Sequence, residues 1–275
     1  MQIDIPLGIG DLFLMRLIYD KYNLQEDIIF NRHILIDYRA YSSQLENFTL
    51  ELIAILFPKN NIIHRPSPKH TITNKFIKQY SLSPKDINIK NHFNLDPVFN
   101  FDYIVIHTKM RMDLLPSKGK LTDWYRKLGE FFRLAKFKKE LKVVILGEKE
   151  IKYQTRETKS VYTYSAYDII NQLKLNNHVI DLSDERDLYV KPDINKFLFE
   201  IRIVANAVMT FGIGWGGNFA ITWGVSDNFS FFINHLNHIV ISAIEGQRDP
   251  RKKLHRNIDD FMNSFTPFLE LEIKL

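Results

Sequence analysis

Four glycines in the carboxyl-terminal half of the chain have the spacing that most clearly suggests a binding site. Gly212, Gly214, Gly216 and Gly217 follow a short apolar run at 207–210 and precede an expected helix at 218–223. A strand that ends in glycines and leads into a helix offers backbone N–H groups and the positive end of a helix dipole to an anion. The same glycines also suit a tight turn that packs a helix against a sheet. This stretch therefore predicts either a phosphate site or a structural turn.

A shorter glycine turn lies near the amino terminus, where Gly8 and Gly10 precede Asp11. It separates an expected strand at 2–5 from a helix with an apolar stripe. We expect Asp11 at the helix N-cap, where its carboxylate would accept hydrogen bonds from the first turn. The alternative is a carboxylate held at the carboxyl end of a strand, where open α/β sheets bind their ligands.

Polar residues also follow two continuous apolar runs, 101–108 and 143–146, which we interpret as buried strands. Lys109 and Arg111 come after the first run, and two cations there suit a phosphate or a carboxylate, although an exposed charged loop has the same composition. Glu148 comes after the second run and suits either a ligand site or a solvated turn. We expect His107 to be a packed strand residue.

The expected strands and helices that position these residues alternate along the chain. This alternation predicts an α/β fold with parallel sheets and helices on both faces. The polar segment 81–99 is the expected boundary between two Rossmann-like domains facing a cleft, 1–98 and 99–275. Further strands are expected at 34–36, 61–64, 178–182 and 229–233, and helices at 45–57, 71–80, 121–137, 162–173, 195–206 and 259–265.

Composition limits the function further. The 275 residues are 45% hydrophobic and 25% charged, which suits a folded chain with a sizeable core. Without cysteine there is no disulfide or thiolate metal site. The net charge of +5 favours acidic ligands and does not require nucleic acid. No apolar run reaches the length of about 18 residues that spans a bilayer. We therefore expect a cytoplasmic protein, with peripheral membrane contact left open.

Five segments in order resemble the heptosyltransferase-like glycosyltransferases of GT-B fold: GIGDLFLMR, VIHTKMR, VVILGEKE, VIDLSD and ANAVMTFGIGWGGNFAITWG. The resemblance covers the first 20 residues and most of the carboxyl-terminal half. It implies transfer of a sugar from a nucleoside-diphosphate donor to an acceptor hydroxyl, without a metal or a cofactor. Asp11 would be the general base. The last turn lacks the Asp-x-Gly and nearby His of that family, and its Trp-Gly pair is weakly similar to fucosyltransferases.

The resemblance also implies a donor site. Thr108 and Lys109 would contact the diphosphate with added charge from Arg111, and Glu148 would approach the nucleoside. The full expected set is Gly10, Thr108, Lys109, Arg111, Glu148, Gly212, Gly214, Trp215, Gly216, Gly217 and Asn218. The final helix would pack back on the amino-terminal domain. Two alternatives stay open: a nucleotide-sugar-binding or interaction module without catalysis, and a nucleotide-sugar epimerase.

Overall fold

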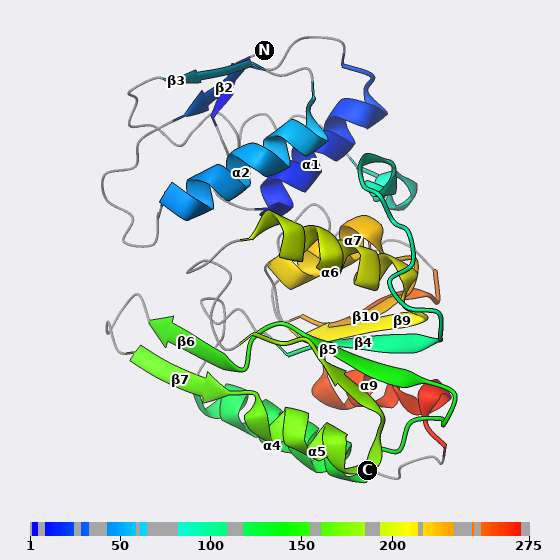
Figure 1. The fold of residues 1–275 in the computed structure, drawn as a ribbon. Helices are drawn as coiled ribbons and strands as arrows, with labels where there is room; N and C mark the ends of the chain where they lie inside the picture. Colours follow the sequence, from blue (N-terminus) through cyan, green and yellow to red (C-terminus); the bar gives the residue numbers. More distant parts are fainter. Residues whose placement is uncertain are drawn as a thin grey trace.

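The computed structural model describes residues 2–4, 9–24, 29–32, 43–58, 61–64, 82–108, 118–154, 161–184, 193–213, 217–233, 244 and 249–270. Figure 1 shows these residues as stacked layers, with a small sheet at the top, two pairs of helices in the middle, and a larger sheet with further helices below it. The described residues begin in the small sheet and end at the opposite side of the molecule, beside the larger sheet.

The larger sheet has six strands in the order β11-β10-β9-β4-β5-β8, and every neighbouring pair is parallel. Strands buried on both faces need side chains that are apolar in succession, as in YIVIH of β4 and KVVIL of β5. The strands are β4 (Tyr103–His107), β5 (Lys142–Leu146), β8 (Val179–Asp181), β9 (Met209–Ile213), β10 (Phe229–Phe232) and β11 (Lys252–His255).

Helices cover both faces of this sheet (Figure 1). Along β4, Tyr103 and Val105 belong to the core under one set of helices, whereas Ile104 and Ile106 belong to the core under the other. This alternation follows from the two-residue period of a strand. Helices α6 (Ile194–Asn206) and α7 (Gly217–Val225) pack on the first face, and α4 (Lys118–Leu134), α5 (Tyr167–Asn176) and α9 (Ile258–Asn263) pack on the second.

The amino-terminal part is a three-stranded parallel sheet with helices α1 and α2 beneath it. Its elements are β1 (Gln2–Asp4), α1 (Ile9–Lys21), β2 (Ile29–Arg32), α2 (Ser43–Leu56) and β3 (Asn61–His64). The buried side chains of α1 and α2 belong to the same hydrophobic core as those of α6 and α7. The two sheets are thus connected through two layers of helices that share one core.

Helix α1 lies directly along helix α7. A Cβ atom added at Gly10 would stand 3.6 Å from the Cβ of Ala220, and one added at Gly224 would stand 3.0 Å from the ring of Phe13. The rings of Phe13 and Trp223 meet edge to face, with centroids 5.8 Å apart. Because residues 10 and 13 of α1 meet residues 220 and 224 of α7 in the same sequence direction, the amino-terminal ends of both helices lie together.

Residues 82–100 are tied to both helix layers. This segment contains the short 3-10 turns η1 (Pro84–Asp86) and η2 (Lys90–His92). The Ile89 N–H donates to the Gly224 carbonyl at 2.9 Å, and His92 Nε2 lies 2.7 Å from Asp20 at the end of α1. The Arg202 guanidinium of α6 donates to the Asp96 carbonyl at 2.9 Å. The expected linker is therefore a packed strap across α1, α6 and α7.

One ion pair of this strap gives a prediction about pH. Asp86 accepts hydrogen bonds from Ser83 N and Oγ at 2.6 Å and pairs with Lys21 at 2.7 Å. Burial raises the pKa of the Asp86 carboxyl, but Lys21 and Ser83 outweigh burial and lower it to about 2. A carboxyl whose pKa is lower in the folded state stabilises the fold above its unfolded pKa, and this stability is lost as the pH falls through the folded pKa.

We expect Asp86→Asn to reduce the free energy of unfolding by about 1 kcal/mol at pH 7, as for a partly exposed ion pair with added hydrogen bonds. The difference from the wild type should shrink between about pH 4 and pH 2 and disappear below it. Urea titrations at a series of pH values measure this difference. A deficit that is the same at pH 7 and pH 2 would show that the charge of Asp86 contributes nothing.

An antiparallel hairpin follows β5. It consists of β6 (Glu150–Gln154) and β7 (Val161–Ser165), paired from Glu150 opposite Ser165 to Gln154 opposite Val161. The sequence pattern predicted a helix over 162–173, and the first part of that prediction is wrong. The helix begins only at Tyr167, because residues 161–165 pair with β6.

The structure confirms some of the other expected elements and corrects others. The α/β class is confirmed, as are the strand at 61–64 and the helix that ends before Pro58. The final helix α9 packs against α4, β10 and β11, so its expected packing on the amino-terminal helices is wrong. The charged edge strand β11 was not expected. The predictions for 34–36 and 71–80 lie outside the described residues, and the domain boundary stays a prediction.

Candidate nucleotide site

The order of the six strands defines one special position at the carboxyl edge of the sheet. The chain builds outward from β4 through β5 to β8, and then returns to the other side of β4 to add β9, β10 and β11. The carboxyl ends of β4 and β9 are therefore adjacent strand ends from which the connections leave to opposite faces. In open α/β sheets, ligands bind in the crevice at this topological switch point.

Thr108 and Glu148 meet next to this position. Thr108 is 5% exposed, and its hydroxyl lies 3.2 Å from the Leu146 carbonyl and 3.0 Å from the Glu148 carbonyl. Gly147 has a φ of 102°, a conformation that favours glycine, and this bend turns the chain from β5 into Glu148. The Glu148 side chain is 3% exposed. The structure thus brings these two predicted residues together, with the Thr108 hydroxyl directed to main-chain acceptors.

The loop after β8 is joined to the loop after β5. The Lys149 N–H donates to the Asp184 carbonyl at 2.7 Å, and the Asp184 N–H donates to the Gly147 carbonyl at 2.8 Å. Asp184 also forms an ion pair with Lys196 in the first turn of α6. These contacts hold Glu148 next to Asp184, with which it also forms a parallel β-bridge. The sequence reasoning missed Asp184 and Lys196, because their pairing brings together residues on either side of a loop.

Asp181 anchors the same edge. It lies at the end of β8, pairs with Lys174 at 2.8 Å and accepts a hydrogen bond from Ser183 N at 3.1 Å. Burial raises the pKa of the Asp181 carboxyl, but Lys174 and Ser183 outweigh burial and lower it. Asp181 therefore stays ionised and holds the loop in place. In the sequence, Asp181 was indicated only as part of the segment VIDLSD.

The amino-terminal ends of α7 and α1 complete this region. Helix α7 begins at Gly217 directly after the glycine turn, and its amino-terminal end lies beside that of α1, as the Gly10–Ala220 contact shows. Asp11 is the third residue of α1 and lies in its first turn. The predicted N-cap position for Asp11 is wrong, because the helix begins two residues earlier at Ile9. Two helix amino termini together favour an anion.

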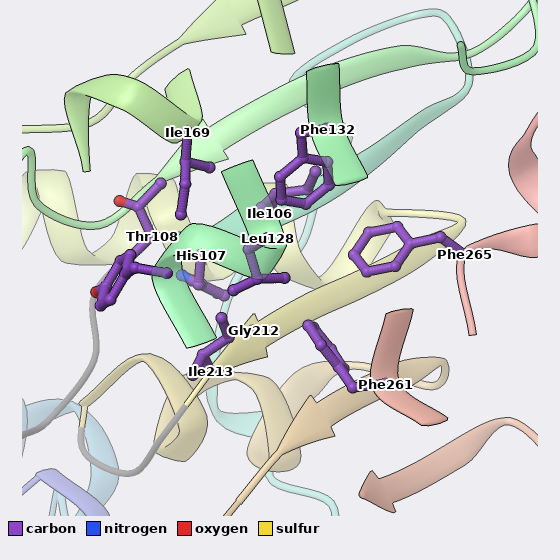
Figure 2. A pocket seen from close by; sticks show the side chains of 11 residues that line it. Ile106, His107, Thr108, Leu128, Phe132, Ile169, Gly212, Ile213, Phe261 and Phe265 are labelled. Carbon is purple, nitrogen blue, oxygen red and sulfur yellow. The ribbon is translucent and has the colours of Figure 1, made fainter. Parts of the chain in front are cut away.

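His107 is the last residue of β4 and is one of the residues that line the pocket in Figure 2. Its side chain is 1% exposed, its Nε2 lies 3.4 Å from Thr222 Oγ1, and its Nδ1 has no hydrogen-bond partner among the described residues. Burial lowers the pKa of His107 to about 3, so the imidazole is neutral at physiological pH. The prediction that His107 is a packed strand residue is confirmed.

A small cavity lies below His107 and Thr108 (Figure 2). Its volume is about 10 Å³, which is room for one water molecule and not for a sugar. Its walls are mainly apolar and include Leu128, Phe132 and Phe265. A ligand at the switch point must therefore bind above the strand ends, on the side of the loops, and not inside the sheet.

Gly212 lies inside β9 and not in the turn that follows it. A Cβ atom at this position would stand 2.4 Å from Cζ of the Phe231 ring. The Phe231 ring is itself packed by the rings of Phe219 and Phe229, with centroids 5.2 and 6.1 Å away. The prediction that Gly212 belongs to the glycine turn is therefore wrong. Its lack of a side chain makes room for Phe231.

We expect Gly212→Ala to lower the free energy of unfolding by about 1–3 kcal/mol, because a buried, enclosed ring must shift. Gly10→Ala is the matched control, since its Cβ would be in ordinary contact at 3.6 Å and alanine favours a helix. Thermal and urea unfolding of both variants measure the difference. Equal stability of the two variants would contradict the packing role of Gly212.

The structure places only part of the predicted site. It brings Thr108, Glu148 and the start of α7 to one edge of the sheet, with Gly10 and Asp11 beside α7. For Asn218 the backbone is described as the second residue of α7. The following predicted residues lie outside the described residues: Lys109, Arg111, Gly214, Trp215 and Gly216.

The described part of the chain contains no group of three or more His, Asp or Glu side chains placed to hold a metal ion. Among the same residues, no helix has both the length and the apolar character needed to cross a membrane.

The parallel sheet, its strand order and the helices on both faces define a Rossmann-like α/β fold. Comparison with known proteins adds no family: no family model matches the chain, and no curated protein matches it.

Proposed function

We propose that this protein is a glycosyltransferase that moves a sugar from a nucleoside-diphosphate donor to an acceptor hydroxyl. The observation that carries the proposal is the convergence of the β4 end, the β5 end and the amino terminus of α7 at the switch point of a Rossmann-like sheet. Such an edge suits a nucleotide, since backbone N–H groups at a helix amino terminus bind phosphate oxygens.

In this proposal the diphosphate lies over the amino terminus of α7, and Glu148 faces the nucleoside. The joined loops after β5 and β8 hold Glu148 in place through the Lys149–Asp184 and Asp184–Gly147 hydrogen bonds. A carboxylate at the end of the second strand is placed to accept hydrogen bonds from ribose hydroxyls. The sequence alone supports the roles of Lys109, Arg111 and the glycine turn as further contacts to the diphosphate in this proposal.

The reaction requires a base close to the same helix ends. Asp11 lies in the first turn of α1, whose amino terminus adjoins that of α7. The acceptor oxygen attacks the anomeric carbon and forms the new glycosidic bond, while the bond from that carbon to the diphosphate breaks. The hydroxyl proton passes to the Asp11 carboxylate, and the nucleoside diphosphate leaves with the electron pair. The helix amino terminus stabilises the developing negative charge.

Isothermal titration with ADP, GDP, UDP, CDP and dTDP tests the nucleotide site directly. We expect one of them to bind to the folded protein, and the matching nucleotide sugar to bind more tightly because it adds sugar contacts. The absence of binding across the panel would overturn the proposal. NMR of a bound nucleotide sugar distinguishes the alternatives: an epimerase converts the donor without an acceptor, whereas a module without catalysis leaves it unchanged with any acceptor.

A further inference from the structure

The surface on the far side of the sheet carries a groove that the nucleotide site does not use. It lies between helices α4 and α5, which run side by side in Figure 1. Its volume is about 440 Å³, within the range of about 300–1,000 Å³ that is typical of small-molecule sites. The groove is therefore large enough for a ligand, in contrast to the cavity below His107.

Helix α4 has a glycine in its interior, Gly129, and this residue lines the groove. No atom lies within 4 Å of a Cβ added at Gly129, so the packing of the described residues does not require glycine there. A glycine in a helix interior is less favourable than alanine by about 0.5–1 kcal/mol. The helix thus carries a cost at this position, and the space that a side chain at Gly129 would fill belongs to the groove.

The walls of the groove carry hydrogen-bonding groups with balanced charge. The charged residues that line it are Arg126, Arg133, Glu130 and Asp168, whose four formal charges sum to zero. Arg126 is paired with Glu130 at 2.7 Å, whereas Arg133 and Asp168 form no ion pair with the described residues. A polyanion such as a nucleic acid needs a cationic surface, which this groove does not offer. Its chemistry suits a neutral ligand rich in donors and acceptors.

One residue that lines the groove, Gln172, has a side-chain acceptor without a partner among the described residues. The Oε1 atom of Gln172 is buried and accepts no hydrogen bond from the described residues. A buried acceptor without a donor costs free energy, and rotation of the Gln172 amide toward a bound hydroxyl group would remove that cost. The aromatic ring of Tyr125 and the side chain of Ile169 add apolar surface for the C–H faces of a sugar ring. Hydroxyls and C–H faces together are the features of a carbohydrate.

The groove also connects to the nucleotide site. Tyr125 and Ile169 line both the groove and the small cavity below Thr108. The Tyr125 hydroxyl donates to the Thr108 carbonyl at 3.4 Å. One end of the groove therefore lies at the carboxyl edge of the sheet, where the reaction is proposed to occur. An extended ligand that reaches this edge has a path between α4 and α5.

We propose that the groove between α4 and α5 binds a neutral oligosaccharide. That this oligosaccharide is the distal part of the transferase acceptor rests on the proposed function. That the groove binds carbohydrate does not depend on the proposed function. The groove would then hold the acceptor chain at a distance from the reacting hydroxyl and set which glycan is elongated.

Titrations with maltotetraose, cellotetraose, chitotetraose and a linear mannotetraose, followed by saturation-transfer NMR, test the proposal. We expect at least one of them to bind to the wild type. Gly129→Phe fills the groove and should weaken binding at least tenfold, while the matched variant Gly129→Ala should bind within twofold of the wild type. Gln172→Leu removes the buried acceptor at similar volume and should also weaken binding, so the test does not depend on the folding of one variant.

Three results would overturn the proposal: no binding of any of the four oligosaccharides, binding that both Gly129→Phe and Gln172→Leu leave unchanged, or a wild-type dimer that Gly129→Phe dissociates. The last would show that the groove is an interface between copies of this chain. Nucleoside-diphosphate titrations of the same samples separate the two proposals. Oligosaccharide binding without nucleotide binding would reject the transferase and leave the groove assignment standing.

Discussion

Asp11→Asn should lower the rate of sugar transfer by about 10²–10⁴-fold, the usual contribution of a general base. Asparagine keeps the shape of the side chain and its place in the first turn of α1, but it cannot take a proton from the acceptor hydroxyl. The donor should still bind with unchanged affinity, because the proposed diphosphate contacts come from α7 and the ends of β4 and β5. The loss should therefore appear in kcat and not in donor affinity.

Asp20→Asn is the matched control for this experiment. Asp20 lies on the same helix at its other end, is 38% exposed, and pairs with Arg16 and His92. Its substitution should change stability slightly and leave transfer close to the wild-type rate. If Asp11→Asn retains full turnover while both proteins are folded, the base assignment is wrong.

Phe265→Ala should lower the free energy of unfolding by about 3–5 kcal/mol, as expected for a large aromatic side chain removed from a core. Phe265 is fully buried. Its ring stacks on that of Phe211 in β9, with centroids 3.8 Å apart, and meets the rings of Phe131 and Phe132 of α4. The substitution would leave a cavity between a central strand and the helices on one face of the sheet.

Urea denaturation followed by circular dichroism measures this loss. Leu134→Ala is the control, because Leu134 is 54% exposed at the end of α4 and surface substitutions usually change stability by at most about 0.5 kcal/mol. A loss below about 1.5 kcal/mol for Phe265→Ala would contradict the central position of this ring, since a buried aromatic cannot be removed so easily.

The sequence pattern was sufficient for the strands at the centre of the larger sheet. Strands β4 and β5 are buried on both faces, and their continuous apolar runs can be identified without knowledge of their neighbours. Once these strands are parallel, Thr108 and Glu148 must lie at the same edge. That part of the candidate site follows from periodicity and a general rule about sheets.

The errors arise where distant residues decide the local structure. Gly212 looked like part of a turn because glycine is common in turns, but its place in β9 depends on the Phe231 ring of the next strand. The hairpin β6–β7 depends on pairing across a loop, which local apolar patterns do not reveal. Strand β11 carries Lys252 and Lys253 because it is the edge strand, where charged side chains discourage further pairing.

The contact of α1 with α7 has a consequence for how a substrate enters. Phe13 and Trp223 are each at most 1% exposed, and they lie between the amino-terminal and the carboxyl-terminal parts of the chain. A hinge motion that separated these parts would bring both rings into water, at about 1.5–3 kcal/mol for each large side chain. Wide opening of the two halves is therefore costly. In the proposed transferase, substrate entry and release would then depend on local rearrangement at the sheet edge. We expect the two halves to unfold in a single cooperative transition.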